Sequence, residues 1–255
     1  LYSRFFTKAI NKSNNQINID EPFKNLFTQG MVCHETYKDL KGNWLYPEEV
    51  LLKDNIATKK TDKSEVIVGP PESMSKSKKN TIDPENIINN YGADSVRLFI
   101  LSDSPPEKDV QWSEQGMIAA YKFIQKFWLL HTKIIKEIKN KKRKNENIDL
   151  TIYTNKLIKK YTSSLEKFNM NVLIAYLHET YNFLIKEIEN SDIRDLEKNY
   201  LKILILMSPL LPHLVEECLK DLKKNKSISW PIAQKEYLEE KLVNIVIQIN
   251  VKKNL

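Results

Sequence analysis

The sequence predicts a chain of two parts, a mixed α and β part followed by an antiparallel bundle of helices. Between residues 34 and 70, short apolar runs alternate with Gly, Asn, Asp and Lys, which is typical of a small β-rich unit. From residue 113 onward, apolar residues recur at three- and four-residue steps, which predicts amphipathic helices. With 255 residues, the chain is long enough for one large domain or two ordinary ones.

The segment before the β-rich unit is predicted to contain a helix and a strand. Residues 1–11 fit the end of an apolar helix, whose aromatic residues are available to a core. Residues 31–33 form a short apolar run that fits a buried strand. Gly30 precedes this run, and a close approach of another backbone segment explains it as well as a β-bulge does. At the far end of the unit, Pro70-Pro71 is expected to end the strands.

Two short helices are predicted after the β-rich unit. Asp83 is a good N-cap, Pro84 suits the first helical position, and Gly92 is expected to stop the helix. A second short helix is expected over residues 94–101, and residues 110–112 are expected to be extended.

The helical part is predicted to hold one long helix and four shorter ones that pack antiparallel. Their expected ranges are 114–139, 154–167, 171–189, 196–207 and 212–223. Trp230-Pro231 closes this part. Strict alternation of apolar residues over 243–249 then predicts a strand. Because a lone strand leaves its edges unpaired, this segment is expected to belong to a domain that is not complete here.

Composition excludes several kinds of site. The five glycines are isolated, so the sequence contains neither a dinucleotide fingerprint nor a Walker-type phosphate loop. The two cysteines and four histidines are scattered, which predicts a reducing compartment and no protein-bound metal. No apolar run reaches the roughly 18 residues of a membrane span. The net charge of +7 is compatible with a nucleic-acid partner without requiring one.

The candidate functional stretch is residues 73–80, Ser-Met-Ser-Lys-Ser-Lys-Lys-Asn. Its hydroxyl side chains supply hydrogen-bond donors and acceptors, and its lysines supply positive charge for a polyphosphate. On its own, such an octapeptide is more typical of a solvated basic loop. The sequence around it decides between the two interpretations.

The octapeptide resembles the Lys-Met-Ser-Lys-Ser signature of class I aminoacyl-tRNA synthetases, written here Ser73-Met74-Ser75-Lys76-Ser77. The resemblance continues through Asp83-Pro84, Tyr91-Gly92-Ala93-Asp94 and Arg97-Leu98-Phe99. Residues 105–116 and the 34–70 segment are similar to leucyl-tRNA synthetases of bacterial type in particular, and they oppose an isoleucine, valine or methionine enzyme.

The resemblance implies how the chain is divided. Residues 1–112 would be the C-terminal part of a Rossmann-like α/β catalytic domain, in which 34–70 is the leucine-specific insertion and 73–77 the signature loop. Residues 113–235 would form an all-α bundle of the anticodon-binding type. Residues 236–255 would start a truncated C-terminal α+β domain.

The resemblance also implies the activity, that of a leucine–tRNA ligase. Such an enzyme uses ATP, with Mg²⁺, to convert leucine to leucyl-adenylate and transfers it to leucine tRNA. It is cytoplasmic and monomeric when complete. The second lysine of the signature stabilises the pyrophosphate leaving group, and this role falls on Lys76. Met74, Ser75 and Ser77 would shape the loop and contact the nucleotide.

Two departures from the family pattern affect these expectations. The first signature lysine is Ser73 here, which removes one cation and leaves Lys78 as the candidate to compensate. The family's His-x-Gly-His motif is not in the sequence, so no aminoacylation is expected from the chain alone. The alternative is a non-catalytic tRNA- or RNA-binding module with a vestigial loop. The lysines of residues 139–144 fit tRNA contact and a solvated face equally well.

Overall fold

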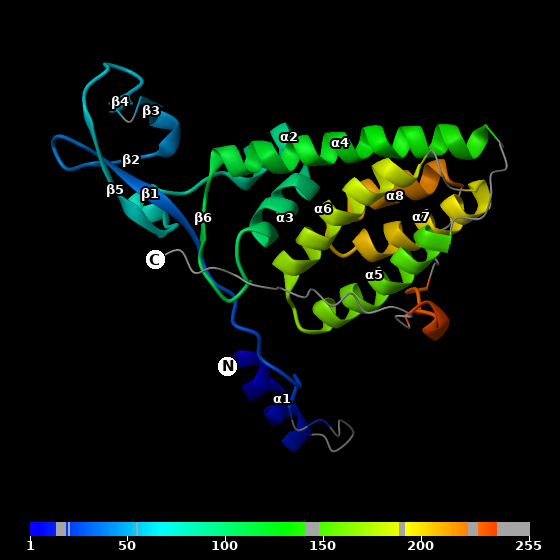
Figure 1. Ribbon diagram of the computed structural model, residues 1–255. Helices are drawn as coiled ribbons and strands as arrows, with labels where there is room; N and C mark the ends of the chain where they lie inside the picture. The colour runs from blue at the N-terminus through cyan, green and yellow to red at the C-terminus, as the bar shows by residue number, and fades with distance from the viewer. Residues whose placement is uncertain are drawn as a thin grey trace, which may run out of the picture.

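The computed structural model describes a β-rich region and a helical region, which meet at one end of helix α4 (Figure 1). The described residues are 1–13, 19, 21–54, 56–140, 148–188, 192–223 and 229–238. The predicted strand over 243–249 and most of the basic connector lie outside these residues.

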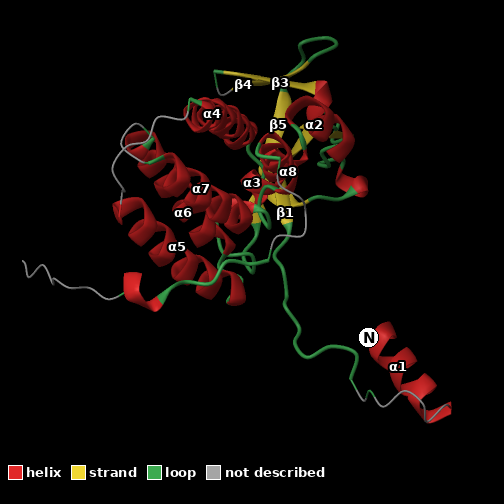
Figure 2. Ribbon diagram, turned by 90° about the vertical axis from the view of Figure 1, so that its right-hand side faces the viewer, coloured by secondary structure: helices red, strands yellow, loops and turns green. Residues whose placement is uncertain are grey.

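The N-terminal helix α1 (Tyr2–Ser13) stands apart from both regions (Figures 1 and 2). The helix itself is as predicted, but none of its residues is buried, and the Phe5 side chain is 72% exposed. Arg4 and Lys8 form ion pairs with Glu21, which tie the helix to the segment that follows it. The hydrogen bond from Arg4 is the main reason why the pKa of Glu21 falls to about 2.

The β-rich region contains a four-stranded sheet built on β1 and a separate hairpin. In the sheet, β1 pairs antiparallel with β2 and β5 and parallel with β6. The hairpin joins β3 to β4. The strand bounds are β1 (Val32–Asp39), β2 (Trp44–Leu45), β3 (Val50–Lys53), β4 (Ile56–Lys59), β5 (Val66–Ser73) and β6 (Val110–Gln111). A 3₁₀ turn, η1 (Pro47–Glu49), lies between β2 and β3. The predicted β-rich character of residues 34–70 is therefore confirmed.

Two expectations for this region are wrong. Residues 32 and 33 lie in a strand, β1, as predicted, but the run is not buried, because Met31 is 54% exposed and the first residues of β1 are only partly buried. Pro70-Pro71 does not end β5, which continues to Ser73. Within the described sheet β5 pairs with β1 alone, so its prolines lie on an edge strand, where a missing N–H is tolerated. The register with β1 shifts opposite them.

Of the two explanations for Gly30, a β-bulge and a close approach of another backbone segment, the structure supports the close approach. A Cβ atom at Gly30 would lie 2.1 Å from the carbonyl oxygen of Lys108. The Gly30 N–H donates to the carbonyl of Pro106 at 2.8 Å. This contact holds the segment before β6 beside the start of β1, where the parallel pairing begins.

The predicted helix boundaries in the segment after the β-rich unit are confirmed. Asp83 caps α2 by accepting a hydrogen bond from the Glu85 N–H at 3.0 Å, and Gly92 ends it with a φ of 81°. Of the residues expected to be extended, 110 and 111 form β6, and the Trp112 N–H donates to the carbonyl of Cys33 at 2.7 Å. The helix bounds are α2 (Pro84–Tyr91), α3 (Ala93–Ser102), α4 (Glu114–Lys139), α5 (Ile148–Glu166), α6 (Met170–Glu187), α7 (Ile193–Met207) and α8 (Pro212–Asp221).

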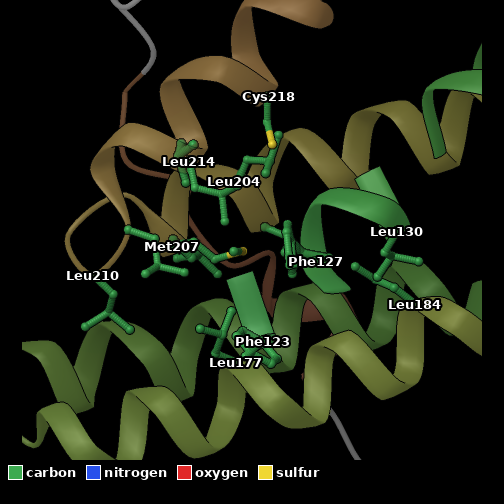
Figure 3. Close-up of a cluster of buried hydrophobic side chains, with 14 of the residues drawn as sticks. Phe123, Phe127, Leu130, Leu177, Leu184, Leu204, Met207, Leu210, Leu214 and Cys218 are labelled. Carbon is green, nitrogen blue, oxygen red and sulfur yellow. The ribbon is translucent and has the colours of Figure 1, made fainter. Parts of the chain in front are cut away.

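Helices α3 to α8 share one apolar core, part of which is drawn in Figure 3. Phe127 of α4, Leu177 and Leu184 of α6 and Leu204 of α7 are almost completely buried in it. On α4, apolar residues at three- and four-residue steps form the predicted buried face, whereas Trp128 is 37% exposed. Trp128 lies one residue away from Phe127, whose three- and four-residue neighbours occupy the buried face.

The segment after α8 lies against α5. The Trp230 indole N–H donates to the Thr162 hydroxyl at 2.9 Å, and the Gln234 N–H donates to Asn155 at 2.8 Å. A short 3₁₀ turn, η3 (Lys235–Tyr237), follows. None of the helices in the described residues is long and apolar enough to cross a membrane.

Candidate functional site

Residues 73–80 form a compact turn at the end of β5. The Met74 N–H donates to the carbonyl of Val32 at 3.1 Å, which continues the pairing with β1. Ser75 caps the 3₁₀ turn η2 (Lys76–Lys78), since its Oγ accepts from the Lys78 N–H at 3.4 Å. The Ser75 and Ser77 hydroxyl oxygens lie 3.2 Å apart. Ser75 and Ser77 therefore each have a partner within the turn.

Asn80 ends this stretch, and its side chain is fully buried. Its Oδ1 accepts a hydrogen bond from the Ser75 N–H at 2.8 Å. Its Nδ2 donates to the carbonyls of His34 on β1, at 3.2 Å, and Glu72 on β5, at 3.1 Å. Only an amide both accepts and donates in this way, so Asn80 fixes both ends of the loop to the sheet.

The sequence did not identify Asn80 as a site residue. Its partners come from two strands, one of which lies 46 positions away in the chain. The only signal in the sequence was its place at the end of the basic run.

The three lysines of the loop have different environments. Lys78 forms an ion pair with Glu72. The ammonium group of Lys79 lies 5.1 Å from the centre of the Tyr46 ring, a cation–π contact. Lys76 is exposed, and within the described ranges it has neither an ion pair nor an aromatic partner. Lys76 is therefore the loop cation that is free to meet an anion.

The predicted site residues stay together in the structure but face open surface. Met74 and Ser75 are partly buried, whereas Lys76 and Ser77 are exposed. A cleft of about 1060 Å³ lies between the β-rich region, the ends of α2 and α3 and the start of α4, but none of residues 73–80 lines it. The loop therefore lies at the surface of the described residues, outside this cleft.

The cleft is lined by one tyrosine whose pKa is strongly raised, and it contains no cluster of metal ligands. Burial raises the pKa of Tyr37 far above its usual value, and its hydroxyl donates to Glu35 at 2.9 Å. Across the described part of the chain, no three His, Cys, Asp or Glu residues gather where they could hold a metal ion.

Two family descriptions match the two regions of the chain. Residues 66–113, which contain the loop, match "tRNA synthetases class I (I, L, M and V)". Residues 147–254 match "Anticodon-binding domain of tRNA ligase". The chain therefore belongs to the class I aminoacyl-tRNA synthetases, and its helical region matches their anticodon-binding domain.

Individual relatives define the synthetase more closely. The leucine–tRNA ligase of Bartonella henselae is 42% identical over 272 residues, which cover 99% of this chain and 30% of that protein. Those of Rickettsia bellii and Parvibaculum lavamentivorans are 40% and 38% identical over 99% of this chain. The resemblance to bacterial leucyl-tRNA synthetases is thus confirmed. The chain spans about 30% of the length of these relatives.

A solved structure has the same fold. It is the ternary complex of the Agrobacterium radiobacter K84 agnB2 LeuRS with tRNA and LeuAMS. The match has a TM-score of 0.68 at 22% identity, and it covers 93% of this chain and 27% of that chain.

Proposed function

We propose that this chain is the signature-loop and anticodon-domain part of a leucine–tRNA ligase. The enzyme would use ATP to convert leucine to leucyl-adenylate and would transfer the leucine to its tRNA. The observation that carries the proposal is the free, exposed Lys76 on a loop whose other lysines are engaged. This loop lies in a region that matches class I synthetases.

The chemistry assigns Lys76 to the leaving group. When the leucine carboxylate attacks the α-phosphate of ATP, the bond to pyrophosphate breaks and negative charge develops on the departing phosphates. An ammonium group placed against that charge stabilises the transition state more than the ground state. ATP enters as its Mg²⁺ complex, so the metal belongs to the substrate.

The other signature residues would shape the loop around the nucleotide. The Ser75 and Ser77 hydroxyls order the turn, and Met74 anchors it to β1. Ser73 contributes no charge. Lys78 could compensate only by leaving Glu72, and an ion pair this exposed is worth about 1 kcal/mol or less.

The rest of the proposed enzyme follows from the family. Residues 1–112 would complete a Rossmann-like catalytic domain, for which the parallel pairing of β1 with β6 is the structural support. Residues 113–235 would bind leucine tRNA, and 236–255 would start the next domain. The complete enzyme would be a cytoplasmic monomer.

Complementation tests this function. The 255-residue chain would be co-expressed with a fragment of the Bartonella henselae enzyme that carries the residues outside the aligned region. We expect leucine-dependent exchange of pyrophosphate into ATP from the pair and from neither part alone. Exchange that is absent although the two parts co-purify would contradict the proposal.

The second candidate is a non-catalytic RNA-binding module. Ser73 and the Lys78–Glu72 ion pair favour it, because they leave a single free cation in the loop. This candidate predicts that the chain binds leucine tRNA in a gel-shift assay while the complemented pair shows no pyrophosphate exchange. The enzyme proposal predicts both activities.

A further inference from the structure

The turn between α7 and α8 lacks the partners that helix ends need. Leu211, at the N-cap of α8, has no side chain that can accept a hydrogen bond, and Pro212 has no N–H to donate. The first turn of α8 therefore requires an acceptor from elsewhere in the molecule. The carbonyls of Pro209 and Leu210 lie beyond the end of α7 and require donors.

Asp94 of α3 supplies the missing acceptor. Its Oδ2 accepts from the Leu214 N–H at 2.7 Å, and its Oδ1 lies 2.9 Å from Nδ1 of His213. The carboxylate belongs to a residue that is only 6% exposed. A negative charge at a helix N-terminus also interacts favourably with the helix dipole. Asp94 thus caps α8 from 120 positions away in the chain.

Arg97, one turn further along α3, supplies the donors. Its Nη2 donates to the carbonyl of Pro209 at 2.6 Å, and its Nε donates to that of Leu210 at 3.1 Å. Residues three apart lie on the same face of a helix, so Asp94 and Arg97 both contact the α7–α8 turn. We call these two residues the α3 clamp.

The α3 clamp joins the two regions that match different families. Asp94 and Arg97 lie in the synthetase segment 66–113, whereas all four of their partners lie in the anticodon-binding segment 147–254. The hydrogen bonds therefore join the sequence segment that holds the signature loop to the α7–α8 turn, within the core that α3 shares with α4 to α8.

A short path connects the α3 clamp to the loop. The loop leads into α2, and Gly92 alone separates α2 from α3. Ile87 and Tyr91 of α2 pack against the core that contains Leu98 and Phe99 of α3. Because both helices are held by packing, α2 cannot remain in place when α3 shifts.

We propose that Asp94 and Arg97 are positioning residues that couple the α7–α8 turn of the bundle to the signature loop. The coupling is a mechanical property of this fold and can be measured without substrate. Its use rests on the proposed function: tRNA seated on the bundle would bias the position of Lys76. In a complemented enzyme, Arg97→Gln would then reduce the change that added tRNA makes in the rate of pyrophosphate exchange, while exchange without tRNA would change less.

Hydrogen exchange on the whole 255-residue chain tests the coupling directly. The variants are Asp94→Asn and Arg97→Gln, and the control is Ser102→Ala, which removes a hydrogen bond confined to α3. We expect at least tenfold faster exchange at the Leu214 amide and at least threefold faster exchange at the Ser75 and Lys78 amides of the loop. The control should leave both places unchanged.

The outcomes separate coupling from a purely local cap. Faster exchange at Leu214 with an unchanged loop would mean that Asp94 only caps α8, and it would overturn the proposal. Unchanged exchange at both places would overturn it as well. None of these readouts depends on ATP, leucine or tRNA, so they hold whether or not the complemented pair is active.

A variant in the loop provides an independent test of the coupling if Asp94→Asn and Arg97→Gln fail to fold. Coupling between two sites is reciprocal, so a change in the loop must also change amide exchange at the α7–α8 turn. Asn80→Ala loosens the loop and should speed exchange at Leu214 at least threefold. Exchange at Leu214 that equals that of the unaltered chain would contradict the coupling.

Discussion

The helical bundle and the signature loop are stabilised by different interactions. The bundle is held by a continuous core of large apolar side chains contributed by α3 to α8. The loop is held by one buried amide, two hydroxyls and the ends of two strands. Apolar burial sums to a large stabilisation, whereas each hydrogen bond adds only about 1 kcal/mol net. The bundle therefore sets the global stability, and the loop can open without unfolding the rest.

The largest expected effect is in the bundle. Phe127 is fully buried in the shared core. Removing its ring leaves a cavity, so Phe127→Ala should lower the free energy of unfolding by about 3–5 kcal/mol. Urea unfolding followed by circular dichroism measures this loss. Leu129→Ala is the control on the same helix, because Leu129 is 62% exposed, and it should change stability by about 0.5 kcal/mol or less. Equal losses in the two variants would contradict the description of the core.

A smaller and local effect is expected at the loop. Asn80→Ala leaves the Ser75 N–H and two strand carbonyls without their partner, a local cost of about 1–3 kcal/mol. Amide exchange should rise at residues 72–80, while the urea midpoint should move less than in Phe127→Ala. Asn89→Ala, at an exposed position of α2, is the matched control and should alter neither measurement. A midpoint shift as large as that of Phe127→Ala would place the loop in the global core.

The smallest effect concerns the polar part of the bundle. His131 is fully buried, with its ring 2.9 Å from the Tyr200 hydroxyl and 3.2 Å from Asp221. Burial lowers the pKa of His131. As the pH falls below about 6.5, the unfolded chain therefore binds more protons than the folded chain does. The contribution of neutral His131 to the free energy of unfolding is lost as the pH falls.

Urea unfolding between pH 7.5 and 5.5 checks the sign. The free energy of unfolding of the unaltered chain should decrease as the pH falls. That of the His131→Asn variant should decrease less over the same interval. Burial also lowers the pKa of His178, which leaves a residual slope in the variant. Identical slopes in both proteins would show that His131 does not titrate differently on folding.

The sequence predicted the features that depend on near neighbours. The caps at Asp83 and Gly92 and the stripe on α6 involve residues within one or two turns of each other, so their patterns are visible in the chain. The strand that continues through Pro70-Pro71 was missed, because an edge position depends on which strands pair, and no local pattern records this.

The same limit applies to the candidate site. Lys76 was identified from its motif, but its freedom from partners depends on Glu72 and Tyr46, which engage the other two lysines. Asn80 and Asp94 fix their surroundings through partners 46 and 120 positions away. Such contacts are set by the tertiary fold, so periodicity and composition carry no trace of them.

The proposed contact between Lys76 and the departing pyrophosphate can be tested in the complemented pair. Its most direct test is leucine-dependent pyrophosphate exchange by the complemented pair with Lys76→Ala, beside Lys79→Ala as a control with the same charge change. Lys76→Ala should reduce the exchange rate at least a hundredfold, about 2.7 kcal/mol of transition-state stabilisation, with little change in leucine binding. Lys79→Ala should reduce it less than tenfold. Exchange left intact by Lys76→Ala, or lost equally in both variants, would contradict the assignment.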